Sequence, residues 1–270
     1  MYDLRSIELG NTSIIEMAEL LSSVFPDSKK FSPEFLQWQY VDNPVGRVVG
    51  FNAFLEDELA AHYATIPVLW KVNGESKKGL LSLNTATHEN HRGKKLFTQL
   101  ADKTYALAKE MGYEFVIGVA NANSTPGFVK KLDFKILCPL DAYLSLSSKH
   151  QDEKPFNSIS LWTGDSLFWR FQNPANAYRK GKNAVLSSTH ISLVKAMLYN
   201  NETVSVLPLM KSKSLIKLHI GWNNKPTGLS IKIPKKRQPS PLNLIYRPLT
   251  NHQAPEAKDV CFRLMDFDAY

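Results

Sequence analysis

The stretch from Leu80 to Met111 constrains the fold of this chain most, because it joins a strand, a short basic loop and an amphipathic helix. Residues 80–87 alternate apolar and polar side chains, which predicts a strand. From Leu96 onward, apolar residues recur every three or four positions, which predicts a helix with one buried face. Gly112 follows the last apolar position, where a helix commonly ends. A strand, a loop and a helix in this order are typical of α/β proteins.

The loop between the strand and the helix, residues 88–95, is rich in cations. Backbone N–H groups at a helix start lack partners within the helix and carry partial positive charge, so a helix start attracts anions. Arg92, Lys94 and Lys95 add positive charge there, although lysines at this end oppose the helix dipole. A bound polyanion would explain them, and a solvated basic loop is the alternative.

The segment before Leu80 predicts a strand, two helices and a hairpin of two strands. Their expected bounds are residues 4–8, 11–24, 32–43, 47–55 and 59–68. After the long helix, residues 115–120 form an apolar run that predicts a buried strand. A polar turn at residues 121–127, a short helix at residues 128–132 and an extended run at residues 134–137 follow, and Ser124 is expected to cap the short helix. The predicted order is β-α-α-β-β-β-α-β-α-β.

This order, together with the Arg92–Gly93 loop, resembles the acyl-CoA core of the GNAT N-acetyltransferase superfamily over residues 50–144. The resemblance implies an α/β fold of the α+β type, with a mixed central sheet and helices on both faces. It also implies acetyl-CoA as co-substrate and no metal. In that family the loop carries R-x-x-G-x-G/A, and its backbone N–H groups hold the pyrophosphate. Here Lys95 replaces the central Gly and Phe97 replaces the last Gly or Ala. The Lys95 side chain would either add charge to this site or block it.

The resemblance also implies which residues hold the co-substrate. The end of the central strand would pair with the pantetheine amides, the loop would hold the pyrophosphate, and the asparagine turn would lie along the pantetheine arm. The implied residues are Thr85, Ala86, Thr87, Arg92, Gly93, Lys94, Lys95, Leu96, Phe97, Asn121, Asn123 and Phe128.

Acyl transfer to an amine requires both substrates in attack geometry and removal of a proton from the amine. The tyrosine that the family often places in the short helix is replaced here by Val129, so the usual general acid is absent. The remaining candidates for catalysis are His62 and Tyr63, on the strand next to the central one, and Asn84, which would order a water. A purely structural role is the alternative for His62.

Net charge and cysteine content narrow the class of protein. A net charge of +8 favours anionic partners without choosing among them. Cys138 and Cys261 make neither a disulfide framework nor a metal site. The sequence has no apolar run of ~18 residues and no secretory signal, which predicts a cytoplasmic protein without a membrane span.

The second half of the chain contains an echo of the first. One copy consists of Leu36, Trp38, Tyr40 and Asn43, and the other of Leu167, Trp169, Phe171 and Asn173. The distance from Trp to Asn differs by one residue, and a chance match is the alternative to duplication. Duplication predicts a GNAT domain at residues 1–148 and a second, degenerate GNAT-like lobe at 149–270, joined by a polar linker near residues 146–154. The second lobe lacks an Arg-Gly loop and is expected to have no CoA site.

Three functions are consistent with these features. The first is an acyl-CoA-dependent N-acyltransferase that moves an acetyl group to the amine of a small molecule, with an amino sugar as the candidate acceptor. The second is an aminoacyl-tRNA-dependent transferase of the tandem GNAT-like type, for which the sequence shows no clear aromatic and basic groove. The third is a non-catalytic CoA-binding lobe. The acceptor, the acyl length, the general base and the oligomeric state stay open.

Overall fold

The structure is a computed structural model that describes residues 1–149, 155–181, 184–189, 191–200, 209–212, 214–238 and 240–267. Residues 150–154 of the expected linker lie outside this set. The α-helices are α1 (Asn11–Val24), α2 (Pro33–Leu36), α3 (Leu96–Glu110), α4 (Thr125–Lys131) and α5 (Gly164–Phe171). A π-helix, η1 (Gln37–Val41), continues α2. The short 3₁₀ helices are η2 (Glu89–His91), η4 (Lys235–Arg237), η5 (Ala257–Asp259) and η6 (Leu264–Asp266).

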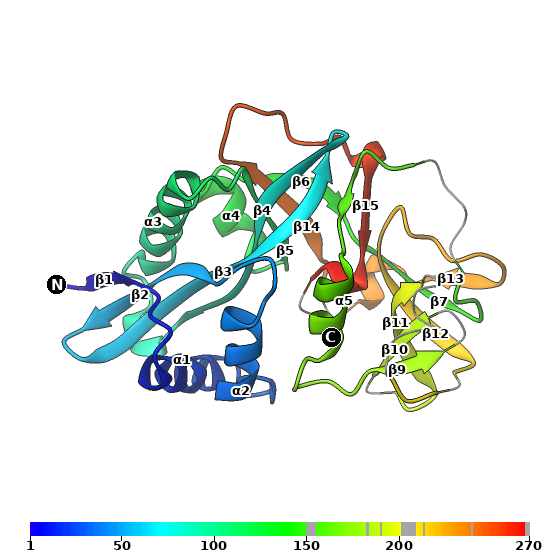
Figure 1. Cartoon of the computed structure of the whole chain (residues 1–270), viewed down its shortest axis with the longest axis horizontal. Helices are drawn as coiled ribbons and strands as arrows, with labels where there is room; N and C mark the ends of the chain where they lie inside the picture. Colours follow the sequence, from blue (N-terminus) through cyan, green and yellow to red (C-terminus); the bar gives the residue numbers. More distant parts are fainter. Residues whose placement is uncertain are drawn as a thin grey trace.

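The strands of the first half are β1 (Asp3–Ser6), β2 (Val49–Leu55), β3 (Glu58–Val72), β4 (Glu75–Thr87), β5 (Phe115–Ala120), β6 (Lys135–Pro139) and β7 (Asp141–Ser145). Those of the second half are β8 (Ser158–Ser160), β9 (Arg179–Gly181), β10 (Ala184–Ser188), β11 (Val194–Asn200), β12 (Ile216–Trp222), β13 (Ser230–Lys232), β14 (Asn243–Pro248) and β15 (Val260–Arg263). Figure 1 shows two lobes, with β15 and α5 between them.

The first lobe is a mixed sheet covered by helices on both faces, as the sequence predicts. On one face α1 and α2 pack against the sheet through Leu21 and Phe35, and Ile66 lies in the same core. On the other face α3 packs through Leu100, in a second core with Tyr63. Successive residues of a strand point to opposite faces, so the neighbours His62 and Tyr63 lie on different sides of the sheet. Among the described residues, no helix has the length and hydrophobicity needed to cross a membrane.

Each lobe is completed by a strand from the other half of the sequence. In the first lobe β14 lies between β5 and β6 and is antiparallel to both. In the second lobe β7, which follows β6 in the chain, lies between β12 and β13 and is antiparallel to both. A division of the chain at residue 148 would therefore separate β14 from the sheet it completes and β7 from its partners. The predicted boundary describes the sequence halves and does not follow the sheets.

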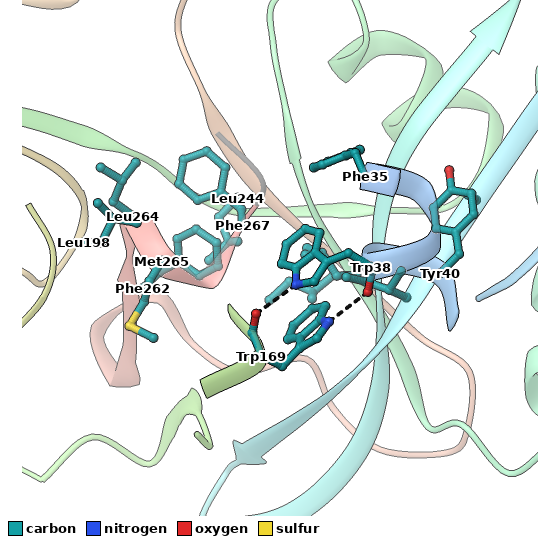
Figure 2. Close-up of a cluster of buried hydrophobic side chains, with 14 of the residues drawn as sticks. Phe35, Trp38, Tyr40, Trp169, Leu198, Leu244, Phe262, Leu264, Met265 and Phe267 are labelled. Carbon is teal, nitrogen blue, oxygen red and sulfur yellow. Dashed lines mark hydrogen bonds between the residues drawn. The ribbon is translucent and has the colours of Figure 1, made fainter. Parts of the chain in front are cut away.

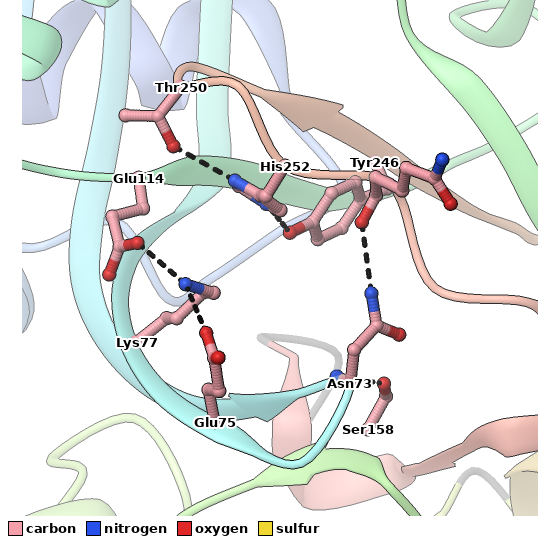
Figure 3. Close-up of polar contacts among 9 residues, drawn as sticks. Asn73, Glu75, Lys77, Glu114, Ser158, Tyr246, Thr250 and His252 are labelled. Carbon is pink, nitrogen blue, oxygen red and sulfur yellow. Dashed lines mark hydrogen bonds and ion pairs between the residues drawn. The ribbon is translucent and has the colours of Figure 1, made fainter.

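Polar contacts hold the β3–β4 turn of the first lobe against residues of the second half of the chain (Figure 3). The Asn73 backbone N–H, in the β3–β4 turn, donates to Ser158 Oγ at 3.0 Å, and Asn73 Nδ2 donates to the Gln253 carbonyl at 3.1 Å. Tyr246 of β14 contacts His252 Nε2 through its hydroxyl at 2.7 Å. The β3–β4 turn is thus held by residues that lie far along the chain.

Two tryptophans form a reciprocal contact where the lobes meet. Trp38 of η1 and Trp169 of α5 stack with ring centroids 4.8 Å apart and planes 16° from parallel. Each indole N–H donates to the other residue's backbone carbonyl at 2.8 Å (Figure 2). These are the two tryptophans of the sequence echo, so the echo marks an interface with approximate two-fold symmetry.

The π-helix explains why the two copies of the echo differ in spacing. In η1 the Asp42 N–H donates to the Gln37 carbonyl at 3.1 Å, five residues back, so this turn holds one residue more than an α-turn. The corresponding turn of α5 is α-helical. Both copies then form the same turn, in which Asn43 Oδ1 accepts from Val45 N at 3.0 Å and Asn173 Oδ1 accepts from Ala175 N at 2.9 Å.

Candidate active site

The two central strands of the first lobe separate part-way along their length. β4 and β5 are parallel and pair from Gly79 with Phe115 to Ser82 with Gly118. Beyond Ser82, β4 remains paired with β3 as far as Thr87, but its pairing with β5 ends. The backbone of residues 85–87 therefore has one edge that no described strand covers. An extended ligand with amide groups is suited to such an edge.

A bulge lies at the point of separation. The β3–β4 register shifts between His62 and Ala64, and Asn84 opposite them has φ +45°. Asn adopts this left-handed conformation more readily than most residues, so its presence here fits the local backbone. The bulge directs the Asn84 side chain toward η1, where Nδ2 donates to Gln39 Oε1 at 2.6 Å and to Tyr40 Oη at 2.9 Å.

The basic loop after β4 has an unusual backbone. Gly93 has φ +78°, and Lys95, the residue that caps α3, has φ +61°. A non-Gly residue in this region costs about 1–2 kcal/mol, which explains why a glycine suits the position that Lys95 occupies. The Lys95 side chain is exposed, so it extends into solvent while its backbone leads into the first turn of α3.

The cations of this loop have no carboxylate partner among the residues that the structure describes. In the described part of the chain, no carboxylate forms an ion pair with Arg92, Lys94 or Lys95, and all three are exposed. The first turn of α3 contains no acidic residue. Its first N–H groups have no partners within the helix. Helix-start N–H groups and exposed cations are together suited to an anion.

Aromatic side chains pack in the core next to the basic loop. Phe97, in the first turn of α3, is partly buried and contacts Phe128 of α4 edge-to-face at 5.2 Å between centroids. Phe128 is 7% exposed and also packs on Phe134 at 5.1 Å. Leu96 is buried as well, so only its backbone is available to a ligand. The ring of Phe128 thus belongs mainly to the core.

The asparagine turn after β5 is organised by its first residue. Asn121 Oδ1 accepts from the backbone N–H groups of Asn123 and Ser124, both at 3.0 Å. Asn121 and Asn123 are exposed and lie next to the end of β5. Ser124 makes no capping hydrogen bond to α4, so the expected cap is wrong: its hydroxyl accepts from the Asn121 N–H instead, at 3.0 Å.

A buried hydrogen-bond chain leads away from Asn84 on the α1/α2 face of the sheet. Tyr40 Oη lies 2.8 Å from His62 Nε2, and His62 Nδ1 lies 2.7 Å from Asn52 Oδ1. Because the Asn52 oxygen only accepts, His62 carries its proton on Nδ1 and accepts from Tyr40 at Nε2. Complete burial lowers the pKa of His62 to about 3. The imidazole is therefore neutral near pH 7.

A second polar cluster lies on the α3 face. Tyr63 Oη is 2.8 Å from Ser82 Oγ and 2.5 Å from Tyr105 Oη. Burial raises the pKa of Tyr63 to about 12, and burial with the neighbouring Tyr63 raises that of Tyr105 well above its usual range. Both phenols are neutral near pH 7. The cluster reaches the separation point through Ser82, the last β4 residue paired with β5.

The three predicted catalytic residues thus occupy different positions. Asn84 lies at the separation point, His62 is connected to it through Tyr40, and Tyr63 lies on the opposite face. Four further residues, which the sequence did not single out for the site, are Gln39, Tyr40, Asn52 and Tyr105. Residues 32–43 were expected to form a helix, but nothing in the sequence indicated that Tyr40 contacts Asn84.

Two depressions lie between the lobes. A cavity of about 50 Å³ is bounded by Trp38, Trp169, Leu81 and Asp266. Asp266 is buried and accepts from Trp162 Nε1 at 2.9 Å and from Arg263 N at 2.7 Å, and burial raises its pKa. An open cleft of about 840 Å³ is lined by residues of α1, α2 and η1, including Trp38, and by two residues that follow α5. Its lining residues are Asn11, Ile14, Ile15, Pro33, Glu34, Gln37, Trp38, Asp42, Gln172 and Pro174.

Comparison with known proteins shows which family this domain resembles. Residues 5–137 match the family model of the acetyltransferase (GNAT) domain. No curated protein gives a significant match to the sequence.

Several solved structures share the fold. A probable N-acyltransferase from Enterococcus faecalis V583 superposes with a TM-score of 0.61 at 9% identity, covering 92% of this chain and 73% of that one. Saccharomyces cerevisiae N-myristoyltransferase with bound myristoyl-CoA gives a TM-score of 0.59 at 10% identity, covering 94% and 83%. Eis1 from Mycobacterium abscessus gives 0.54 at 9% identity, covering 92% and 74%. At such identities these structures support the fold. Because the family match includes the separated strands, the basic loop and α3, residues 5–137 form an acetyltransferase domain of the GNAT superfamily of acyltransferases.

Proposed function

We propose that this N-acyltransferase moves an acetyl group from acetyl-CoA to the amine of a small molecule, with an amino sugar as the leading acceptor. One observation carries the proposal. The point where β4 and β5 separate is followed directly by the basic loop, with its left-handed residues Gly93 and Lys95, and then by the start of α3. The uncovered edge of β4 suits the amides of pantetheine, and the cations after it suit the diphosphate. The proposal includes a cytoplasmic location, which is supported by the buried thiol of Cys138.

In this proposal the backbone of Thr85–Thr87 pairs with the pantetheine arm. The N–H groups at the start of α3 and the side chains of Arg92, Lys94 and Lys95 hold the phosphates. Lys95 contributes charge to the site and leaves it open, because its side chain is exposed. Asn121 and Asn123 lie along the arm, and Phe128 supports it from within the core.

The thioester would lie where β4 and β5 separate, next to Asn84. Asn84 already donates to Gln39 and Tyr40, so its side chain is held in one orientation for a substrate or a water. His62, with its low pKa, serves in this proposal as the fixed acceptor that orients Tyr40. Tyr63 holds Ser82 from the other face.

The acceptor is proposed to enter through the open cleft beside η1. The charged residues of this cleft are the carboxylates Glu34 and Asp42, in a protein with net charge +8. A volume of about 840 Å³ is within the usual range for small-molecule sites. Local negative charge attracts an ammonium group, which supports a polar acceptor with several amines.

The test combines acetyl-CoA binding with a panel of amines. Isothermal titration of the purified chain with acetyl-CoA should show one site, and the Arg92→Ala variant should bind about tenfold more weakly, because a hydrogen bond to a charged group contributes about 1.5–3 kcal/mol. Lys109→Ala, at the far end of the same helix, is the matched control. Turnover should be highest with amino sugars. Binding without turnover on any amine would refute the acceptor class and leave the CoA site standing.

A further inference from the structure

Three potential metal ligands gather next to the basic loop, outside the residues assigned to acyl transfer. Glu58 is the first residue of β3, and His88 and His91 flank η2. One ligand atom from each side chain lies within 4.8 Å of the other two. Glu58 is exposed, His88 is intermediate, and His91 is 6% exposed. The group is thus open to solvent on one side and anchored in the core on the other.

The local backbone explains why the two histidines meet. Residues 89–91 form a 3₁₀ turn, in which side chains three positions apart stand on the same side. The rings of His88 and His91 accordingly lie with their centroids 5.8 Å apart. The β2–β3 hairpin then brings Glu58 to the same side, and His91 Nε2 lies 3.2 Å from Glu58 Oε1.

The orientation of His91 is fixed by a partner on its other nitrogen. Tyr2 Oη lies 2.9 Å from His91 Nδ1, and the two rings contact edge-to-face at 5.7 Å. Histidines that bind metals usually have their second nitrogen held in this way, because the contact fixes the ring and its tautomer. Nε2 of His91 is then the nitrogen left for a ligand, and it faces Glu58.

We propose that Glu58, His88 and His91 bind one zinc-class divalent cation, with water completing the coordination. Two imidazoles and a carboxylate are a common zinc ligand set. Ligands about 2.0–2.1 Å from a tetrahedral metal are about 3.3 Å apart, which the 3.2 Å separation of His91 Nε2 and Glu58 Oε1 matches. A ligand atom of His88 lies within 4.8 Å of the other two, so its ring has to turn toward them. This gives up its contact with the Asn90 N–H, which is long at 3.4 Å.

Such an ion would connect three separate segments. It would join the β2–β3 hairpin to η2, and through Tyr2 it would also hold the residue preceding β1. Because η2 leads directly into Arg92, the ion would fix the start of the basic loop. Its role in this proposal is structural. The spacing of the residues does not indicate the site, since two histidines three apart become a ligand pair only with Glu58 beside them.

The experiment measures Zn²⁺ binding to the full chain by competition with a chromogenic chelator, without any CoA. One Zn²⁺ per chain is expected. Glu58→Gln and His88→Ala should each weaken binding by more than about 100-fold, and Tyr2→Phe by about tenfold. Glu89→Gln, which removes an exposed carboxylate from the same turn, is the matched control and should leave the affinity unchanged.

X-ray absorption at the zinc edge provides a second measurement. Two imidazole ligands and oxygen ligands at about 2.0–2.2 Å are expected for the wild-type chain. No binding in the chelator assay, equal loss in Glu58→Gln and Glu89→Gln, or a spectrum without imidazole scattering would each overturn the proposal. These measurements do not depend on acetyl-CoA, so they are independent of the proposed transferase activity.

Discussion

The two lobes have the same strand pairing but differ at the place where the first lobe has its basic loop. In the first lobe the order β2-β3-β4-β5-β14-β6 is antiparallel except for the β4–β5 pair. In the second, β9-β10-β11-β12-β7-β13 has the same senses, with β11–β12 as the parallel pair. We propose that the lobes arose by duplication with exchange of one strand each.

The parallel pairs are joined by very different connections. Residues 88–114 link β4 to β5 and contain the loop, η2 and α3. Residues 201–215 link β11 to β12 and are about as many as α3 alone contains. The second connection is therefore shorter in sequence than the loop and helix of the first connection together. The comparison indicates that this strand order does not require a basic loop and a long helix in the connection, because the hydrogen bonds of the ladder do not depend on them.

The largest expected effect comes from breaking the contact between the lobes. Trp38→Ala or Trp169→Ala should each lower the free energy of unfolding by about 3–5 kcal/mol, because each removes a buried ring and leaves a carbonyl without its donor. Urea denaturation measures the change. Near-symmetry predicts similar losses and a coupling energy of about 0.5–3 kcal/mol in the double variant. Phe168→Ala, an exposed neighbour, is the control, and strictly additive tryptophan effects would contradict the interface.

The next largest effect is expected from a substitution in the π-helix η1, compared with the matching position in α5. Tyr40→Phe should cost about 1–3 kcal/mol, since it leaves His62 Nε2 without its buried partner and removes one of the two acceptors of Asn84 Nδ2. It should lower kcat more than it raises KM for acetyl-CoA. The matching position in the second lobe, Phe171, has no hydroxyl, so Phe171→Tyr should leave kcat unchanged. Equal kinetic effects of the two variants would show that η1 has no special relation to the site.

The pH dependence of stability tests the two buried histidines. Burial lowers the pKa of His62 to about 3 and that of His219, in the second lobe, to about 4. An unfolded histidine takes up a proton near pH 6.5, whereas the folded one does so only near its lowered pKa. The free energy of unfolding is therefore at its full value above pH 6.5 and declines as the pH falls toward the folded pKa. Each of the two histidines should lower the free energy of unfolding by on the order of 1 kcal/mol for each pH unit below 6.5.

Urea midpoints measured from pH 7 to pH 4.5 check this expectation. His62→Gln and His219→Gln should each reduce the slope of stability against pH. The slope should fall further in the double variant. An unchanged slope in His62→Gln would mean that the Tyr40–His62–Asn52 chain opens readily to protons.

A smaller effect compares the two connections directly. The Arg92→Ala, Lys94→Ala pair should weaken acetyl-CoA binding by about tenfold or more, with little change in stability, because both side chains are exposed. Lys211→Ala, an exposed cation in the second connection, should have no effect. Calorimetric titration measures both. A comparable loss in Lys211→Ala would place an anion site in the second lobe.

The smallest expected effect concerns Lys95. Replacement by Gly relieves a left-handed backbone but adds chain entropy, so the stability should change by less than about 1 kcal/mol. Acetyl-CoA affinity should fall slightly through the lost charge. A clear gain in affinity for Lys95→Gly would show that the lysine obstructs the site.

Local features of the active site were accessible from the sequence, and their connections were not. The strand Leu80–Thr87, the cations of residues 92–95 and the α3 stripe all follow from short-range patterns, since periodicity and caps are encoded within a few residues. The role of Tyr40 is not encoded that way. It depends on a π-turn that adds one residue and on a bulge at Asn84, which lie on different elements and meet only after folding.

The sequence by itself determined the order of elements, the position of the basic loop and the presence of an echoed tryptophan motif. Only the tertiary structure decided that β14 and β7 are exchanged, that Trp38 and Trp169 bind each other's backbone, and that His62 is a neutral, buried acceptor. The physical reason is that a residue pattern specifies which face of an element is buried. What lies across that face is settled by pairing and packing between segments far apart in the chain.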